Sequence, residues 1–211
     1  HQSKQVRLLD RASIPVTKNY RARAFTGYPM DYVPVNRVIK TKNDISNNLG
    51  LPIPSGSVSV FELFGKGAAI QRALAGEGGI GDYAVNEDVE ILLEGGEEVL
   101  ARVVEERRYI TGSRPAPPTM KDATVRDGYT LSEINRIELS NARPVAIDVE
   151  VELHLIDGAE LINADQEPVF RNGLPMFLAT VPPNAMVAIR FQASSPIKPD
   201  EHEDSEEDDE P

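Results

Sequence analysis

The stretch "IDVEVELHLI", from Ile147 to Ile156, alternates apolar and polar side chains with a period of two. Its apolar set is Val149, Val151, Leu153 and Leu155, and its polar set is Asp148, Glu150, Glu152 and His154. Successive side chains of a β-strand point to opposite faces of the sheet. The pattern therefore predicts a strand with one buried face and one solvated face.

The same alternation recurs along the chain, most clearly in "DVEILLE" at 88–94 and "MVAIRF" at 186–191. Weaker strand patterns are "QVRLLD", "VTKNYRARAF", "VNRVIKTK", "AIQRALA", "INRIELSN" and "MFLATV". Gly- and Pro-rich turns such as "GYPMDYVP", "LPIPSG" and "NGLP" separate them. Many short strands between such turns are typical of a sandwich or a barrel, so the sequence predicts an all-β fold.

The segment Glu97–Ile110 fits two kinds of secondary structure. Leu100, Val103, Val104 and Arg107 have helical spacing, whereas Val99, Ala101 and Val103 alternate as in a strand. Because the neighbouring segments all have strand patterns, we expect a strand here.

The stretch "NNLGLPIPSGSVSVFELFG", Asn47 to Gly65, leads from a corner into a strand. Pro52 and Pro54 each lack a backbone donor, so "LPIP" is expected to stay extended outside a central ladder. In the following run, the apolar side chains change face between Val60 and Phe61. This change predicts either a β-bulge at that point or a strand that is covered on both faces.

The Pro-rich segment "TGSRPAPPTMKDA", Thr111 to Ala123, is the clearest candidate boundary between domains. We therefore expect a first β unit, sandwich- or barrel-like, over residues 1–112. A second, immunoglobulin-like β unit is expected over 122–197, and an acidic disordered tail over 198–211. The predicted fold is thus two β-sandwich-like units joined by a Pro-rich connector.

The acidic charge is concentrated at one end of the chain. The net charge is −12, and the tail Asp200–Pro211 holds nine of the 34 acidic residues, which leaves 25 acids against 22 bases elsewhere. A body close to neutrality without a basic stripe argues against nucleic-acid binding. The tail is expected to be disordered and solubilising; the alternative is a binding site for Ca²⁺ or a basic partner.

Composition excludes several further classes of site and segment. The chain has no cysteine, which excludes disulfides, thiolate metal sites and cysteine nucleophiles. No apolar run reaches the roughly 20 residues of a membrane helix, and the start does not have the pattern of a signal peptide. Since the sequence begins with "HQSKQVRLLD" and lacks an initiating Met, it is expected to be a processed or excised piece of a longer chain.

The motif "GEGGIG", Gly76 to Gly81, matches the letters of the dinucleotide fingerprint G-x-G-x-x-G. That fingerprint needs a helix directly after it to hold the pyrophosphate, and here acidic, alternating residues follow instead. A glycine-rich hairpin is the preferred interpretation, and we expect no cofactor.

Histidine occurs only three times, as His1, His154 and His202. His154 shares a face with carboxylates and could bind a stray metal, but a solvated strand face is the preferred interpretation. Two-histidine metal sites and Ser-His-Asp arrangements lack the necessary partners. Carboxylates are numerous, but no pair stands out for glycoside hydrolysis, so we expect neither a metal site nor a catalytic residue.

The stretch "FTGYPMDYVPV", Phe25 to Val35, is the most suggestive candidate for an exposed binding loop. Tyr28, Met30 and Tyr32 are large, amphipathic side chains of the kind that ligand and partner surfaces use. The preferred interpretation is nevertheless that they close the open end of the first β unit, because a small β domain needs large apolar side chains there. As a ligand site, this loop would make the protein a module that binds a surface glycan or another small ligand.

Several segments together resemble the C-terminal domain of unknown function of bacterial mucoidy-inhibitor-like proteins. They are "LPIPSGSVSVFE" (51–62), "GEGGI" (76–80), "NEDVEILLEGG" (86–96), "IELSNARPVAIDVEVEL" (137–153) and "LATVPPNAMVAIRF" (178–191), within a resemblance that spans most of residues 6–193. Asn86 stands where that family usually has glycine, and the acidic tail is not a family feature.

The resemblance implies a mostly β domain at the end of a bacterial protein associated with the cell envelope or periplasm, and it brings no catalytic residues. Together with the residue patterns, it predicts a non-enzymatic structural or interaction module. The expected partner is a protein or another component of the envelope.

Overall fold

The computed structural model describes residues 10–65, 70–112, 130–156 and 158–197. In these residues the chain forms strands and one 3-10 turn. The elements are β1 (Thr17–Phe25), β2 (Met30–Pro34), β3 (Asn36–Lys42), η1 (Ile45–Asn47), β4 (Gly56–Phe64), β5 (Gln71–Ile80), β6 (Asp88–Leu93), β7 (Val99–Thr111), β8 (Thr130–Asn141), β9 (Ile147–His154), β10 (Glu160–Ala164), β11 (Val169–Arg171), β12 (Leu174–Val181) and β13 (Ala185–Pro196). The prediction of an all-β fold is confirmed.

The strands form two sheets. One has eight strands in the order β11-β12-β9-β1-β3-β6-β5-β4, and the other has five in the order β10-β13-β8-β7-β2. β1 and β9 pair in parallel, with Tyr20 opposite Val149 and Ala24 opposite Leu153. This pairing joins the beginning of the chain to its second half at the centre of the larger sheet.

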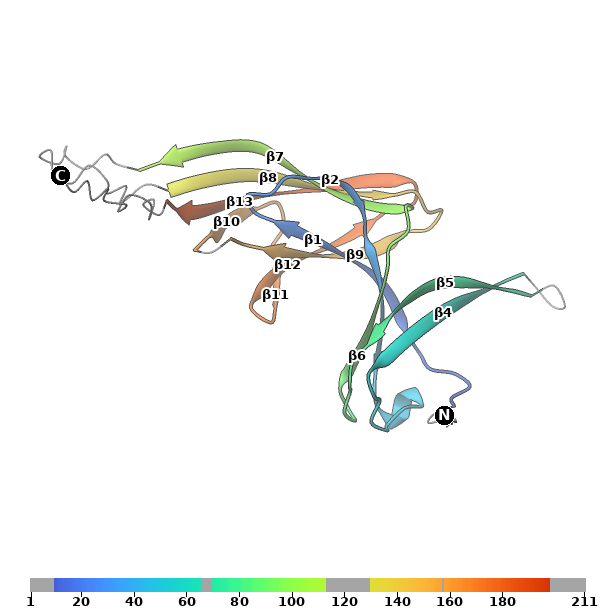
Figure 1. The fold of residues 1–211 in the computed structure, drawn as a ribbon. Helices are drawn as coiled ribbons and strands as arrows, with labels where there is room; N and C mark the ends of the chain where they lie inside the picture. Colours follow the sequence, from blue (N-terminus) through green and yellow to red (C-terminus); the bar gives the residue numbers. More distant parts are fainter. Residues whose placement is uncertain (1–9, 66–69, 113–129, 157, 198–211) are drawn as a thin grey trace, which may run out of the picture.

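The hydrophobic core lies between the five-stranded sheet and the β12-β9-β1 part of the larger sheet (Figure 1). Phe177 on β12 and Phe191 on β13 meet across it, with ring centroids 6.2 Å apart. The other buried members are Tyr20, Ala22, Ala24, Val35, Val99, Ala101, Val103, Ile137, Leu139, Ile147, Val149, Val151, Leu153, Val181, Ile189 and Ala193. Burial of these apolar side chains is the main favourable contribution to folding.

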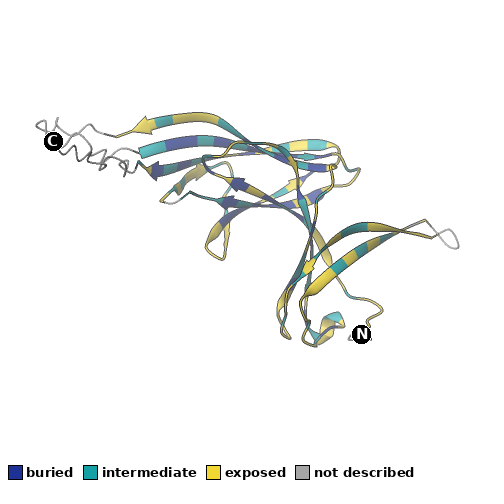
Figure 2. Cartoon of the chain, viewed as in Figure 1, coloured by how far each residue is buried: buried dark blue, intermediate teal, exposed yellow. Residues whose placement is uncertain are grey.

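The larger sheet continues beyond the sandwich through β3, β6, β5 and β4. In Figure 1 the β4–β5 hairpin projects away from the two stacked sheets, and we call this hairpin the arm. Figure 2 shows dark blue, buried residues throughout the sandwich, whereas the arm is exposed or intermediate along its described length. Among the described residues, therefore, no second layer covers the arm.

The alternation in the sequence predicted the strands and their buried faces well. Val149, Val151 and Leu153 are all buried, as the pattern of "IDVEVELHLI" indicates. The weaker segments also form strands, apart from "QVRLLD", which lies almost entirely outside the described residues. The segment Glu97–Ile110, which fitted either a helix or a strand, forms strand β7, so that prediction is confirmed as well.

A β-bulge lies between Val60 and Phe61, which is one of the two predicted alternatives. Val60 pairs with Gly76 and Phe61 pairs with Leu74, so Ala75 is the extra residue on β5. Along β4 itself the side chains alternate regularly, so Val58 and Val60 lie on one face and Phe61 and Leu63 on the opposite face.

The expected division into units 1–112 and 122–197 is not confirmed. Strands from both halves of the chain form both sheets and contribute to one core, because β1 pairs with β9 and β7 pairs with β8. The immunoglobulin-like unit thus stays a prediction. Most of the Pro-rich connector and the acidic tail lie outside the described residues.

Candidate functional site

β4 is an edge strand that offers an unpaired backbone. It is the last strand of the eight-stranded sheet, and no other strand in the described part of the chain pairs with its outer side. β4 runs over nine residues, contains no proline, and carries a single charged side chain, Glu62. Its unpaired N–H and C=O groups are the template to which another extended chain can add.

The other three edge strands in the described residues are short or interrupted. β11 has three residues, β10 has a register shift between Leu161 and Asn163, and β2 has a shift between Met30 and Val33 and ends at Pro34. Short length, bulges and prolines are the devices that protect a sheet edge from further pairing. β4 has none of these devices on its own strand, since the extra residue of the bulge belongs to β5.

Apolar side chains lie uncovered on the arm. Phe61 and Leu63 on β4 and Leu74 on β5 are exposed, and Leu63 reaches 69 %. Phe61 lies opposite Leu74 and Leu63 lies opposite Arg72, so these side chains share one face of the hairpin. The Arg72 guanidinium lies 3.6 Å from the centroid of the Phe61 ring, which makes a cation–π contact at the surface.

The glycine-rich motif at Gly76–Gly81 sets how the arm leaves the sheet. It contributes strand residues up to Ile80, and at Gly78 an added Cβ would lie 2.1 Å from the carbonyl oxygen of Leu92 on β6. Glycine at this position therefore allows β5 to approach β6. The residues after it lead into strand β6, so the helix that a dinucleotide site needs is absent from this described stretch.

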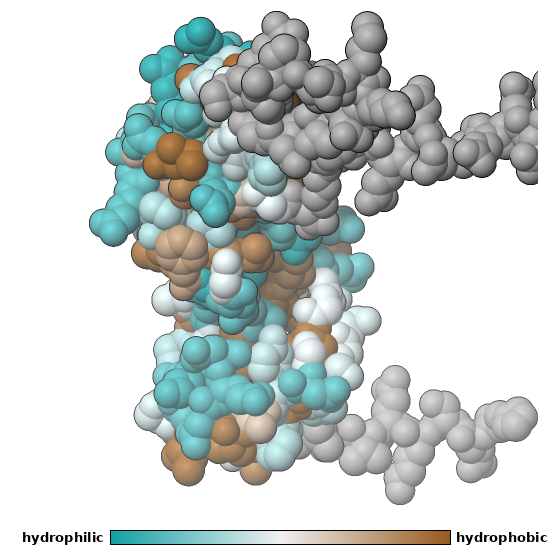
Figure 3. All heavy atoms as spheres, turned by 90° about the vertical axis from the view of Figure 1, so that its left-hand side faces the viewer, coloured by the Kyte–Doolittle hydropathy of each residue, from teal (hydrophilic) through white to brown (hydrophobic). Residues whose placement is uncertain are grey.

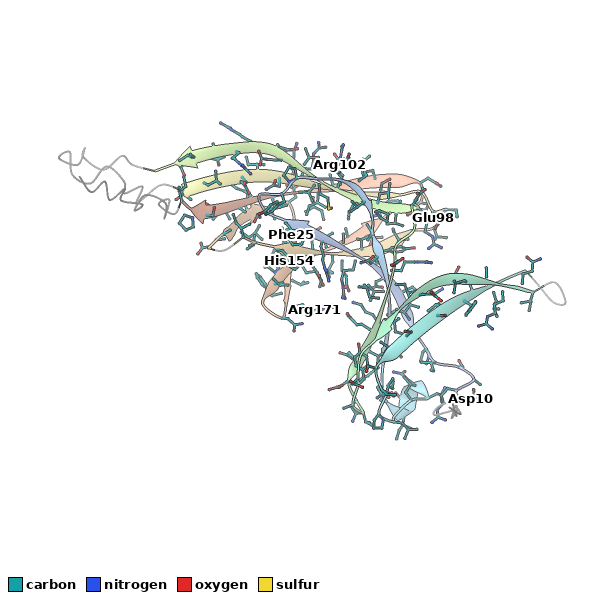
Figure 4. All side chains as sticks on the ribbon, in the orientation of Figure 1. Asp10, Phe25, Glu98, Arg102, His154 and Arg171 are labelled. Atoms are coloured by element: carbon teal, nitrogen blue, oxygen red, sulfur yellow. The ribbon has the colours of Figure 1, made fainter. Side chains whose placement is uncertain are left out.

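A network of ion pairs lies at the centre of the larger sheet. Arg21 on β1 contacts Glu90, Glu150 and Glu152 at 2.8, 3.0 and 3.3 Å, and Lys40 on β3 also pairs with Glu150. Glu150 is only 5 % exposed. Arg171, which Figure 4 labels below the short strand β11, reaches Glu150 at 3.3 Å.

The network shifts the pKa values of Arg21, Glu90 and Glu150. Hydrogen bonding from Arg21 lowers the pKa of Glu90. Burial by itself would raise the pKa of Glu150, but hydrogen bonds from Lys40 and Arg21 leave it lowered overall. Burial likewise opposes the charge of Arg21, yet its bonds to Glu90 and Glu150 raise its pKa. All these groups are thus held in their charged forms, an arrangement that stabilises the sheet and provides neither a general acid nor a general base near neutral pH.

The structure does not bring the three predicted site residues to one surface. Tyr28 lies in the turn between β1 and β2 and is 68 % exposed. Met30 packs against the hydrophobic core, whereas the Tyr32 hydroxyl donates to Glu138 at 2.9 Å on the outer face of the five-stranded sheet. Residues 30–34, expected as loop, form the edge strand β2, because their backbone pairs with β7.

Tyr32 belongs to a second network of charges. Arg102, labelled in Figure 4, lies 4.6 Å from the centroid of the Tyr32 ring and donates to Glu138 at 2.9 Å. Arg136 pairs with the same carboxylate at 2.7 Å. Hydrogen bonding from Tyr32 lowers the pKa of Glu138 and raises the pKa of Tyr32 itself. The Tyr32 side chain is thus engaged within the sheet surface, and a ligand role for Tyr28 and Tyr32 stays a prediction.

His154 lies at the end of β9 beside an aromatic ring. Its ring stacks on Phe25, with the centroids 4.8 Å apart, and Figure 4 labels the two residues at the same place. Its Nε2 lies 3.8 Å from a carboxylate oxygen of Glu152. No cluster of three or more potential metal-ligating side chains occurs in the part of the chain that the structure describes. Within that same part, none of the helical structure could cross a membrane.

Apolar side chains also gather at the far end of the larger sheet. On the face in Figure 3, brown spheres lie at the lower end of the molecule, where Figure 1 places η1. Ile45 on η1 is 82 % exposed, and Leu51 and Val85 are exposed as well. The buried Asn43 fixes this end, because its side-chain amide donates to the carbonyl oxygens of Leu51 and Ala84 at 2.8 Å.

Comparison with known proteins finds no match in any of three searches, against models of protein families, curated proteins and solved structures. Within the described residues, the edge of β4 is the feature best suited to contact another molecule.

Proposed function

We propose that this chain is a non-enzymatic interaction module of a bacterial envelope-associated protein, and that it binds an extended polypeptide segment along the outer edge of β4. The observation that carries the proposal is that β4 is a nine-residue edge strand without proline. The other three edge strands of the described residues are, by contrast, short or interrupted. The envelope setting rests on the resemblance of the sequence to the mucoidy-inhibitor-like domains.

The chemistry of the edge indicates what kind of segment fits. A strand that adds to β4 would satisfy the unpaired backbone groups along its outer side. Its side chains would also lie beside Phe61 and Leu63, so apolar residues at every second position would cover the exposed face of the arm. The partner is thus an extended chain that alternates apolar and polar side chains.

The arrangement of charges supports a non-enzymatic role. The ionisable clusters on both sheets consist of acids paired with arginine or lysine, and the lowered pKa values of Glu90, Glu138 and Glu150 keep these carboxylates charged. General acid–base catalysis instead needs a group whose pKa lies near the working pH.

The test uses a synthetic peptide of alternating Val and Thr that matches the nine residues of β4 in length, with a lysine at each end for solubility. We expect the peptide to protect backbone amides of β4 from hydrogen exchange, as measured by NMR. The same peptide with N-methyl groups on alternate amides should give no protection, because it has lost the donors that a new ladder needs.

Two variants of the chain distinguish binding at the edge of β4 from nonspecific binding to exposed apolar side chains. Leu63→Lys places a charge on the edge strand and should weaken peptide binding. Leu178→Lys changes an equally apolar, exposed residue on β12, which is paired on both sides, and should bind the peptide as the natural chain does. Equal protection by both peptides would overturn the proposal. Protection without peptide that rises with protein concentration would also overturn it, in favour of pairing between two copies.

A further inference from the structure

A hollow of about 220 Å³ lies where the arm meets the sandwich. Its walls come from the middle of the arm, beside the bulge, from the centre of the larger sheet and from the turn that joins β8 to β9. The wall is largely apolar and includes Tyr20, Val38, Val60, Leu93, Val145 and Ile147. The hollow is therefore a real concavity with an apolar surface against which a small molecule can pack.

Two arginines line the hollow without close carboxylate partners. Arg37 donates to the backbone carbonyl of Ala75, its Nε is enclosed without an acceptor, and none of the ion pairs among the described residues includes it. Arg143 donates to the Tyr20 hydroxyl, and its carboxylate partner, Glu98, is 3.8 Å away on a side chain that is 70 % exposed. Both guanidinium groups thus have unused capacity to bind an anion.

The acids around the hollow are already engaged. Glu62 pairs with Lys18 at 3.3 Å, and Asp148 accepts a hydrogen bond from the Thr180 hydroxyl at 2.7 Å. The lining cations Lys18, Arg37 and Arg143 outnumber the lining acids Glu62 and Asp148 by one, so the hollow combines an apolar wall with one net positive charge. An arginine favours a carboxylate above most small anions because the two planar groups can form two parallel hydrogen bonds.

The volume limits the size of the ligand. A hollow of about 220 Å³ is smaller than the roughly 300–1,000 Å³ of sites for drug-sized ligands. We propose that the hollow binds a carboxylate carried by a short apolar group. The carboxylate can belong to a free short-chain acid or to the carboxyl end of a polypeptide with an apolar last residue. This inference is independent of the proposed edge binding, because it rests on the arginines and the cavity and not on the backbone of β4.

The experiment titrates the chain with three probes and follows backbone amide shifts by NMR. Hexanoate represents the free acid, N-acetyl-leucine represents the carboxyl end of a polypeptide, and hexanamide is the neutral control of nearly the same shape. We expect shifts at the residues that line the hollow for at least one of the two carboxylates, at millimolar concentration. Hexanamide should bind about tenfold more weakly or worse, since it lacks the charge that the guanidinium groups bind. The carboxylate that binds with the lower Kd shows whether the hollow prefers a free short-chain acid or the carboxyl end of a polypeptide.

Matched variants test which residues bind the probe. Arg143→Gln should weaken binding about tenfold, whereas Arg190→Gln, on the outer face of the other sheet, should leave it unchanged. Ala146→Leu fills the hollow without removing a charge and should also reduce binding, in contrast to Ala188→Leu on β13. Circular dichroism and urea midpoints check that each variant is folded. Because Arg143→Gln removes a charge and Ala146→Leu fills the hollow, the test stays valid if one of these two variants does not fold.

Three results would overturn the proposal. They are the absence of shifts around the hollow with either carboxylate at millimolar concentration, equal binding of hexanamide and hexanoate, and undiminished binding in folded Arg143→Gln and Ala146→Leu. None of these results changes the exchange protection of β4 by a peptide, so failure here is distinguishable from failure of the proposed function.

Discussion

Arg21 and Glu150 lie directly opposite each other in the parallel pair of β1 and β9, and the guanidinium Nη2 is 3.0 Å from a carboxylate oxygen. This contact joins residues from the two halves of the chain at the centre of the larger sheet. Because Glu150 is buried and also pairs with Lys40 and Arg171, it holds three cations together on one face of that sheet.

Replacement of Glu150 by Gln is therefore expected to destabilise the protein by about 2 kcal/mol, because a neutral amide leaves the half-buried Arg21 and Lys40 with less compensation. Urea unfolding followed by circular dichroism measures the loss. Glu160→Gln, an exposed acid on β10, is the matched control and should stay within about 0.5 kcal/mol of the natural chain. Equal stability of the two variants would show that the network contributes nothing.

The same network predicts the acid side of the stability profile. The pKa values of Glu90 and Glu150 are lowered from 4.5 in the folded protein, so the unfolded chain binds protons at these sites first as the pH falls. Their stabilisation is complete above pH 4.5 and is lost as the pH falls through the lowered folded-state values. Urea midpoints measured from pH 6 downward should decline below about pH 4.5, and Glu150→Gln should flatten that decline. A parallel decline in both proteins would contradict this assignment.

Gly78 is expected to be sensitive to the smallest side chain. A Cβ there would lie 2.1 Å from a backbone oxygen of β6, so Gly78→Ala must separate β5 from β6 and should cost about 2 kcal/mol. Gly56→Ala is the control, because a Cβ at Gly56 meets nothing within 4 Å. Hydrogen exchange at β5 and β6 should rise only in the Gly78 variant. Unchanged exchange in that variant would show that the arm tolerates a shift.

Tyr32 and Tyr28 are expected to differ in their effect on stability. Tyr32→Phe removes the hydrogen bond to the Glu138 carboxylate and should cost about 1 to 2 kcal/mol. Tyr28→Ala alters an exposed turn and should change stability by less than about 0.5 kcal/mol. Thermal and urea unfolding of the two variants decides this. The predicted ligand loop would instead be supported if a glycan bound the natural chain but did not bind a folded variant with both Tyr28→Ala and Tyr32→Ala.

Period-two alternation predicted the long core strands because each has one face in contact with the opposite sheet, and it missed the short edge strands β2, β10 and β11. It could not predict which strands pair. Alternation determines the face of the sheet on which a side chain lies, but it does not indicate which strand lies beside its own. The parallel pairing of Tyr20 with Val149 joins residues far apart in the chain, and it is the reason that the two predicted units share one core.

The candidate surface was harder to predict than the fold. The change of face at Val60 and Phe61 predicted the bulge, but Phe61 and Leu63 have the same pattern as residues under a second layer. Only the fold shows that they are uncovered, because in the described residues the five-stranded sheet packs against another part of the larger sheet. The hollow likewise depends on Arg37 and Arg143 meeting from distant segments, and no local motif marks them.

Asn141 fixes the turn that joins β8 to β9 beside the hollow, and its substitution tests this role. Its side chain is buried, and its amide nitrogen lies 2.9, 3.1 and 2.9 Å from the carbonyl oxygens of Val145, Val181 and Pro182. Its side-chain oxygen accepts from the Arg143 backbone amide at 2.9 Å. One side chain thus ties the turn after β8 to the end of β12.

Asn141→Asp keeps the shape of the side chain but replaces the donor by an acceptor that faces three carbonyl oxygens. We expect it to destabilise the protein more than Asn141→Ala, which should cost about 2 to 3 kcal/mol by leaving those carbonyls without a donor. Lowering the pH should recover part of the loss in the Asp variant, because the protonated acid can donate again. Asn163→Asp, at an exposed position on β10, should have little effect. If Asn141→Asp were as stable as the natural chain at neutral pH, the side-chain amide could not be the donor that fixes this turn.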